Sequence, residues 1–199
     1  MYSLAAGQFA RYPRMNAIKS NVPDVLILEP KVFGDARGYL FESFNARAFE
    51  QATGLREQFV QDNHSHSVRG VLRGLHYQLK NTQGKLVRVA RGEVWDVAVD
   101  LRRSSPTFRQ WTGARLSEEN KRMLWVPPGF AHGFLVLSET ADFLYKTTDY
   151  YNPATERTIL WNDPALKIDW KVEELGGAAP TLSPRDAMGT PLEKAEVFD

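Results

Sequence analysis

Histidine is the first side chain to examine for proton transfer near neutral pH, because the chain has only four histidines and no cysteine. His76 lies in the segment Val71–Gln78, beside arginine, tyrosine and glutamine side chains that are costly to bury without partners. His132 follows the rigid turn Pro127-Pro128-Gly129, which fixes one side chain at the start of the next segment. Each histidine also has a structural alternative, since a histidine in a strand or beside a turn often only satisfies hydrogen bonds.

The other two histidines form the pair His64-x-His66, whose rings point to the same side of a strand. A metal site needs further ligands, and the following Ser67-Val68-Arg69-Gly70 supplies none. We therefore expect a surface or hydrogen-bonded pair and no metal site. The lack of cysteine excludes disulfides, thiolate chemistry and cysteine-type zinc sites.

The composition restricts the partners. Among 199 residues, 25 basic and 24 acidic side chains give a formal charge of +1, without the basic stripe of a nucleic-acid-binding protein. No apolar run approaches the roughly 18 residues needed to cross a bilayer. Residues 1–17 lack the apolar block of a secretory signal. We expect an N-terminal extension over residues 1–17, a single domain over residues 18–199, and a cytoplasmic location.

The elements that must position the histidines are short β-strands separated by glycine, proline and asparagine. We expect them at Val25–Glu29, Tyr39–Phe44, Gln58–Asn63, Val71–Gln78, Leu86–Ala90, Val94–Leu101, Trp111–Leu116, Leu124–Val126, Phe134–Leu137 and Phe143–Thr148. Such a density of short strands predicts a sandwich or a barrel. The period is clearest in Val94–Leu101, where Trp95, Val97, Val99 and Leu101 share one face and Asp96, Ala98 and Asp100 the other.

Only two segments have a helical pattern, which argues against alternating strands and helices. Asn45 is a predicted cap for a helix over Ala46–Thr53, ended by Gly54. Residues Ser117–Arg122 predict one or two helical turns, and the chain from Asp163 onward is expected to be irregular.

Two motifs resemble the halves of the cupin barrel. They are R-G-x-H-x-Q around His76 and P-x-G-x-x-H ending at His132. The resemblance implies an all-β fold, a cupin-like antiparallel jelly-roll barrel with a few short helices. Metal-binding cupins have H-x-H where this chain has His76-Tyr77-Gln78, so we expect no metal and no other cofactor. A metal-dependent cupin enzyme is the alternative.

The chain resembles the dTDP-4-dehydrorhamnose 3,5-epimerase family more closely, from about Val25 to Asp186. The matching segments are Phe33–Gly38, Gln61–Ser65, Val71–Gln78, Gln83–Arg88, Gly92–Asp100, Leu124–Phe134, Phe143–Lys146, Tyr150–Tyr151, Leu160–Pro164 and Leu182–Asp186. The resemblance implies inversion of C3 and C5 of dTDP-4-dehydro-6-deoxy-D-glucose by removing and returning protons beside its C4 ketone. An epimerase of one carbon only and a non-catalytic sugar-binding module remain alternatives.

The same resemblance implies four catalytic roles. His76 is the base, since imidazole is neutral at working pH, and Asp186 is its carboxylate partner. Tyr145 is the acid, because a phenol keeps its proton at neutral pH. Lys85 is the cation that stabilises the enolate oxygen. From the residues alone, Tyr145 would be a packing residue of a sheet and Lys85 a solvated lysine.

The resemblance also implies a set of substrate contacts. Arginines suit phosphate because their planar fork meets two oxygens, and those matching positions around the nucleotide are Arg37, Arg73 and Arg185. His132 contacts the sugar or the same enolate oxygen, and Tyr151 stacks on thymine. Further polar contacts to base and sugar come from Glu42, Gln61, Asn63 and Glu156. In the family, the segment of Arg37 and Glu42 reaches across from a partner subunit, which implies a homodimer.

Three local features need explanation. Arg73 and His76 fall on opposite faces by strict alternation, so we predict a bulge at Gly74. Arg109 stands where glycine is expected, which suggests a turn. The inserted-looking segment Val172–Pro180 lengthens the approach to Asp186, so the pairing of Asp186 with His76 depends on where this segment runs.

Overall fold

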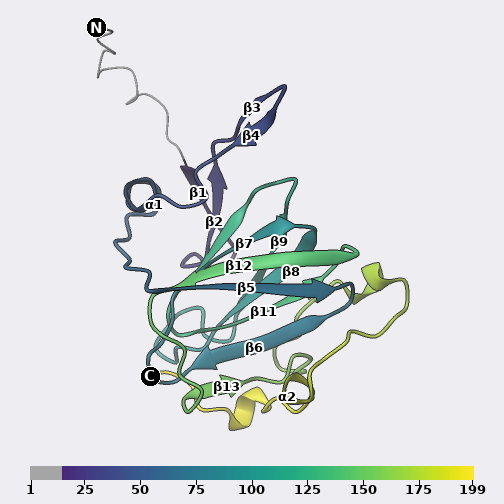
Figure 1. Cartoon of the computed structure of the whole chain (residues 1–199). Helices are drawn as coiled ribbons and strands as arrows, with labels where there is room; N and C mark the ends of the chain where they lie inside the picture. The colour runs from purple at the N-terminus through teal and green to yellow at the C-terminus, as the bar shows by residue number, and fades with distance from the viewer. Residues whose placement is uncertain (1–14) are drawn as a thin grey trace, which may run out of the picture.

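Two antiparallel sheets form the body of this computed structural model, which describes residues 15–199 (Figure 1). The first has the order β1 (Met15–Lys19), β2 (Leu26–Pro30), β10 (Met123–Val126), β7 (Lys85–Arg91), β12 (Thr140–Thr147) and β5 (Gln61–Val68). The second has the order β13 (Glu156–Thr158), β6 (Leu72–Gln78), β11 (Phe130–Val136), β8 (Glu93–Asp100) and β9 (Trp111–Ser117). The expected antiparallel all-β architecture is confirmed.

The remaining elements are small. A hairpin of β3 (Phe33–Asp35) and β4 (Gly38–Leu40) projects from the body (Figure 1). The helices are α1 (Ala46–Thr53) and α2 (Pro184–Ala187), with 3₁₀ turns at Val172–Leu175 and Leu192–Lys194. Among residues 15–199, no helix is long and apolar enough to cross a bilayer. Residues 1–14 of the predicted extension lie outside the described residues, while Met15–Ala17 belong to β1 and pair with β2.

Side chains that alternate along the strands build two apolar layers. Between the sheets, the layer includes Val87, Val94, Ala98, Phe134 and Phe143. The opposite face of the second sheet carries Val97, Val99 and Leu101, as the sequence predicts. The chain after Asp163 covers this face with residues such as Leu166, Trp170 and Leu192. This segment is irregular as expected, and it is also an integral part of the core.

Helix α1 confirms its predicted ends. Asn45 Oδ1 accepts hydrogen bonds from the backbone N–H of Arg47 and Ala48, each at 3.1 Å. Gly54 ends the helix with a φ of 75°. Phe49 on the buried face packs edge-on against Trp125, so α1 covers part of the outer face of the first sheet.

Several predicted elements are wrong or shifted. Ser117–Arg122 forms a turn and no helix, because Ser117 and Asn120 exchange side-chain-to-backbone hydrogen bonds that compete with helical ones. The strand expected over Tyr39–Phe44 ends at Leu40, the last residue of the hairpin. The strand expected to start at Gln58 starts at Gln61.

The bulge predicted at Gly74 is confirmed. Strand β11 pairs His132 with His76 and Phe134 with Arg73, so two steps on β11 match three steps on β6. Gly74 has a φ of 121°, and a Cβ there would lie 2.7 Å from the carbonyl oxygen of His132. Only glycine fits this position. The extra residue turns the Arg73 side chain to the same face of β6 as His76.

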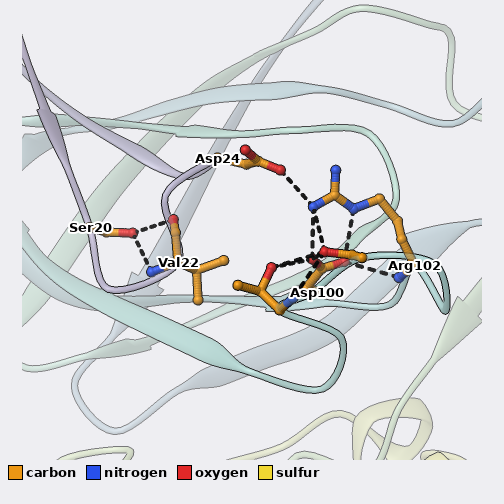
Figure 2. A network of polar contacts seen from close by, with 7 residues as sticks. Ser20, Val22, Asp24, Asp100 and Arg102 are labelled. Atoms are coloured by element: carbon orange, nitrogen blue, oxygen red, sulfur yellow. Dashed lines mark hydrogen bonds and ion pairs between the residues drawn. The ribbon is translucent and has the colours of Figure 1, made fainter.

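The loop after β8 is tied together by a network of polar contacts (Figure 2). Arg102 Nη2 lies 2.7 Å from Asp100 Oδ2 and 2.7 Å from Asp24 Oδ2. The hydroxyls of Ser105 and Thr107 also donate to Asp100 Oδ2, at 2.6 and 2.7 Å. Burial acts to raise the pKa of Asp100, but the hydrogen bonds outweigh it and lower the pKa to about 2. The network joins the β1–β2 loop to the end of β8.

Arg109 closes the same loop. Its φ is 68°, in the left-handed region that favours glycine, and its N–H donates to the carbonyl of Asp100 at 2.9 Å. The expectation that Arg109 occupies a turn is therefore confirmed.

Candidate active site

His76 and Asp186 form a hydrogen-bonded pair across 110 positions of sequence, with His76 Nε2 2.5 Å from Asp186 Oδ1. The His76 side chain keeps 28% of its surface exposed, whereas Asp186 is buried. Burial acts to raise the pKa of Asp186, but hydrogen bonds from His76 and Ser183 and from the backbone of Gly74 outweigh it and lower the pKa. The carboxylate is therefore ionised beside the imidazole at neutral pH.

The short helix α2 holds this carboxylate in place. Ser183 caps the helix by accepting the N–H of Asp186 at 3.1 Å, and Pro184 stands at the first helical position. The hydroxyl of Ser183 donates to Asp186 Oδ2 at 2.8 Å. The inserted-looking segment Val172–Pro180 therefore leaves the pair with His76 intact. Ser183 was not among the predicted site residues, although its position three residues before an aspartate is typical of a helix cap.

Tyr145 lies on β12 of the other sheet and points into the space between the sheets. Phe143 and Tyr145 lie on the same face of β12, toward the space between the sheets, and the centres of their rings are 6.1 Å apart. Burial raises the pKa of Tyr145, the charge of Glu156 adds to this, and Arg73 opposes it. Glu156 and Arg73 belong to the sheet that carries His76. Charged groups of that sheet therefore act on the phenol of Tyr145.

Lys85 begins β7 on the same face as Val87, toward the interior. Its side chain is half-buried, and desolvation lowers its pKa to about 8, while the charges of Glu156 and Asp96 act to raise it. The lysine is thus a cation near neutral pH that is unusually close to titrating.

A second histidine–carboxylate pair lies deeper. His132 Nε2 is 2.9 Å from Asp96 Oδ1 and 3.0 Å from Oδ2, and both side chains are buried. Burial raises the pKa of Asp96, while His132 and Lys85 act to lower it. The ring of His132 stacks on Phe143 at 6.1 Å. Asp96 was missed as a site residue, although the alternation of β8 turns a carboxylate inward, where it needs a partner.

Three predicted contact residues meet at the edge of the site. Glu156 Oε2 accepts from the hydroxyl of Tyr151 and from Arg185 Nη1, each at 2.6 Å. Arg185 Nε also donates to the hydroxyl of Thr158 at 3.2 Å. The N–H of Tyr151 donates to Gln61 Oε1 at 3.0 Å. These contacts link β13, α2, β5 and the loop after β12.

Gln61 and Asn63 lie on the inner face of β5, joined by a 3.0 Å hydrogen bond, with Asn63 opposite Tyr145 in the ladder. Arg73 Nε donates to the hydroxyl of Ser67 at 3.1 Å. Arg73 also lines the hollow that contains His76.

Arg37 and Glu42 lie apart from this group. Arg37 is exposed at the hairpin and pairs with Asp35. Glu42 accepts from Asn45 Nδ2 at 3.1 Å, at the start of α1. Figure 1 shows the hairpin at the end of the molecule opposite β13 and α2.

The His64–His66 pair is hydrogen-bonded, as predicted. His64 Nε2 lies 3.2 Å and His66 Nδ1 2.8 Å from Asp142 Oδ1, and both rings are exposed. Within residues 15–199, no group of three or more histidine, aspartate or glutamate side chains is arranged to hold a metal ion.

Two hollows border these residues. One of about 390 Å³ is lined by Arg73, His76 and Asp186, among others. Tyr145 instead borders a hollow of about 280 Å³ whose lining includes Lys146, its neighbour on the opposite face of β12. Because the Tyr145 ring contacts Phe143 between the sheets, its phenol belongs to the interior. The described residues thus include a histidine paired with an ionised carboxylate beside one hollow, and a phenol and an ammonium group that point inward from the other sheet.

Comparison with known proteins shows the family to which the chain belongs. The model of a family described as dTDP-4-dehydrorhamnose 3,5-epimerase matches residues 19–194. The enzyme of that name from Pseudomonas aeruginosa is 61% identical over 184 residues, which are 92% of this chain and 99% of the relative.

Two solved structures share the fold. The epimerase RmlC from Legionella pneumophila, in complex with dTDP-4-keto-L-rhamnose, has a TM-score of 0.87 at 54% identity and covers 92% of this chain and 95% of its own. The 3'-monoepimerase ChmJ from Streptomyces bikiniensis, in complex with dTDP-quinovose, has a TM-score of 0.81 at 32% identity and covers 90% and 88%. The chain is much closer to the first, and the cupin-like jelly-roll fold is confirmed.

Proposed function

Because the chain belongs to the dTDP-4-dehydrorhamnose 3,5-epimerase family of isomerases, we propose that it converts dTDP-4-dehydro-6-deoxy-D-glucose into dTDP-4-dehydro-L-rhamnose. The observation that carries the proposal is the hydrogen bond between His76 on β6 and Asp186 on α2, with Tyr145 and Lys85 pointing inward from the other sheet. Inversion at C3 and at C5 needs this kind of arrangement: a base on one face of the sugar and an acid on the other.

His76 removes the proton. The C4 ketone acidifies the hydrogens on C3 and C5, and a base of moderate pKa is enough to take them. Because Nε2–H of His76 donates to Asp186, Nδ1 keeps the lone pair that accepts the proton. The ionised carboxylate then stabilises the imidazolium that forms, as the aspartate does in other histidine dyads.

The electron pair left behind moves onto the C4 oxygen as an enolate. Lys85 stabilises this negative charge, which develops only as the proton leaves, so the interaction lowers the barrier more than it strengthens substrate binding. Tyr145 returns a proton to the opposite face of the ring, and its raised pKa keeps it protonated at neutral pH. His132, fixed by Asp96, hydrogen-bonds the sugar or the same oxygen.

The nucleotide occupies the edge of the site. Arg73 and Arg185 bind the diphosphate, and the ring of Tyr151 stacks on thymine. Gln61, Asn63 and Glu156 supply polar contacts to base and sugar. Support for this comes from Arg73 and Arg185, which line the same hollow as His76, and from the hydrogen bonds of Tyr151 and Arg185 to Glu156.

A homodimer completes the site in our proposal. Arg37 and Glu42 lie far from their own His76, and the hairpin that carries Arg37 exposes Phe33, Tyr39 and Leu40. A partner subunit that covers these apolar side chains and receives Arg37 accounts for both features. The cytoplasmic location stays a prediction.

Deuterium exchange tests the reaction. We expect the protein to incorporate solvent deuterium at both C3 and C5 of the substrate in heavy water, and His76→Asn to bind dTDP normally while losing about 10²- to 10⁴-fold in turnover. Label at one carbon only would support a single-site epimerase. Turnover that survives in His76→Asn, or depends on stoichiometric bound metal, would refute the dyad.

A further inference from the structure

Glu156 occupies an unusual position between the edge and the interior of the site. A single oxygen, Oε2, accepts hydrogen bonds from Arg185 Nη1 and from the hydroxyl of Tyr151, both at 2.6 Å. The Glu156 side chain is 12% exposed, whereas Arg185 is 47% exposed. A well-buried carboxylate therefore holds an arginine that reaches into solvent, and each of the three residues comes from a different segment.

The same carboxylate faces inward. Its negative charge acts to raise the pKa of Lys85, which burial lowers, and it adds to the raised pKa of Tyr145. The other charged group acting on Lys85 is Asp96 from β8, and Tyr145 also faces Arg73 and Tyr151. Glu156 is thus in electrostatic contact with both the proposed phosphate-binding arginine and the proposed catalytic cation.

We propose that Glu156 is a positioning residue that competes with the substrate's diphosphate for Arg185, so that binding breaks the Glu156–Arg185 ion pair. The inference rests on the proposed function, because it takes the diphosphate to be the second partner of Arg185. A guanidinium already paired with a carboxylate must leave it to form a two-pronged contact with phosphate. When that pair breaks, the charge of Glu156 acts on Lys85 and Tyr145 alone.

The competition weakens ground-state binding and favours turnover. Free ligand must replace an existing ion pair before Arg185 can contact the diphosphate. In the bound state the same charge helps Lys85 to stay protonated for the enolate. Binding energy is then moved from the bound substrate toward the transition state, which raises the rate constant while the affinity for the substrate falls.

Glu156→Gln is the direct test, since the amide keeps the size of the side chain and an oxygen for Tyr151 and Arg185. Calorimetric titration of the full chain with dTDP should show about two- to fivefold tighter binding in Glu156→Gln, the range of a partly exposed ion pair. The matched control is Glu196→Gln. Glu196 pairs with Arg157 at 2.8 Å on the outer side of the same strand, and its loss should leave dTDP affinity unchanged.

A double-mutant cycle separates competition from general repulsion. In an Arg185→Met background, Glu156→Gln should bring no further gain in dTDP affinity. A gain of the same size in that background would overturn the proposal. Equal or weaker dTDP binding by Glu156→Gln alone would also overturn it, because direct contact of Glu156 with the ligand would then outweigh its competition for Arg185. Wild-type protein that fails to bind dTDP would overturn the proposed function together with this inference.

Turnover provides a second readout that a purely structural role would not move. The alkaline limb of the pH profile of kcat should shift to lower pH in Glu156→Gln, because Lys85 loses one of its two neighbouring carboxylates. An unchanged limb, measured on a variant whose thermal unfolding matches wild type, would contradict the inward role of Glu156.

Discussion

Lys85 should impose an alkaline limit on activity close to physiological pH. A solvated lysine has a pKa of 10.5, and desolvation of Lys85 lowers this to about 8 despite the opposing charges of Glu156 and Asp96. The charged form, which stabilises the enolate, is lost as pH rises through the pKa. About nine in ten Lys85 side chains are charged at pH 7 and only about one in ten at pH 9. Above pH 8, activity should therefore fall about tenfold per pH unit.

The assay is kcat/KM as a function of pH, because this quantity reports the pKa values of the free enzyme. Deuterium incorporation at C3 and C5 measures turnover without a coupling enzyme. Lys85→Met removes the cation and should lower kcat/KM about 10²- to 10³-fold, the typical effect of losing one group that stabilises an oxyanion. The residual activity should no longer decline near pH 8. Lys80→Met is the matched control, since Lys80 is an exposed lysine close by in sequence, and it should leave the profile unchanged.

Two results would refute this reasoning. A wild-type profile that stays flat to pH 10 would mean that Lys85 is better solvated than the structure indicates. A limb near pH 8 that persists in Lys85→Met would assign the titration to another group. Tyr145 is not that group, because burial and the charge of Glu156 raise its pKa above the usual value of 10.

Further variants test the supports of the site. Asp100→Asn, in the network of Figure 2, should destabilise the protein by roughly 2 kcal/mol at pH 7, since the pKa of Asp100 in the folded protein is lowered from 3.8 to about 2. This stabilisation is present above pH 4 and is lost as the pH falls toward 2. Urea unfolding across that pH range measures it. Asp24→Asn, whose side chain is 56% exposed, should cost less than about 1 kcal/mol, and equal effects of the two variants would contradict the network. Ser183→Ala should lower kcat about tenfold at unchanged KM by freeing the Asp186 carboxylate, with Ser183→Thr restoring it; an unaltered kcat would remove Ser183 from the site. Gly74→Ala should destabilise by about 2–4 kcal/mol in urea unfolding, because its Cβ would lie 2.7 Å from backbone at a positive φ, and normal stability would argue against the bulge.

Local features of the fold were predictable because short-range physics determines them. The caps of α1 follow from the hydrogen-bonding of Asn45 and the left-handed freedom of Gly54. The two faces of β8 follow from the period of a strand. The bulge at Gly74 was predictable because Arg73 and His76 were expected on the same face of the strand, whereas strict alternation places residues three apart on opposite faces. Where side-chain-to-backbone bonds compete with a helix, as at Ser117 and Asn120, the local pattern predicted the wrong element.

Long-range pairings were beyond the local pattern. No spacing rule joins His76 to a carboxylate 110 positions away, and only the family resemblance suggested Asp186. Ser183 and Asp96 were missed, because their importance comes from which side chain they meet and not from their own type. Glu156 was expected as a ligand contact, but its pairing with Arg185 depends on how α2 packs beside β13.

The two histidine–carboxylate pairs show why position, and not residue type, assigns the catalytic role. His76 and His132 are directly opposite each other in the β6–β11 ladder, and each meets an aspartate. Asp186 has a lowered pKa and leaves His76 partly open to the hollow, so this histidine can accept a proton and have its charge balanced. Asp96 is fully buried with a raised pKa, and its histidine lies under an aromatic ring, where a second full charge would be costly. We therefore expect His76 to accept the proton from the substrate, whereas the deeper pair is suited to hold a hydrogen-bond donor in a fixed direction.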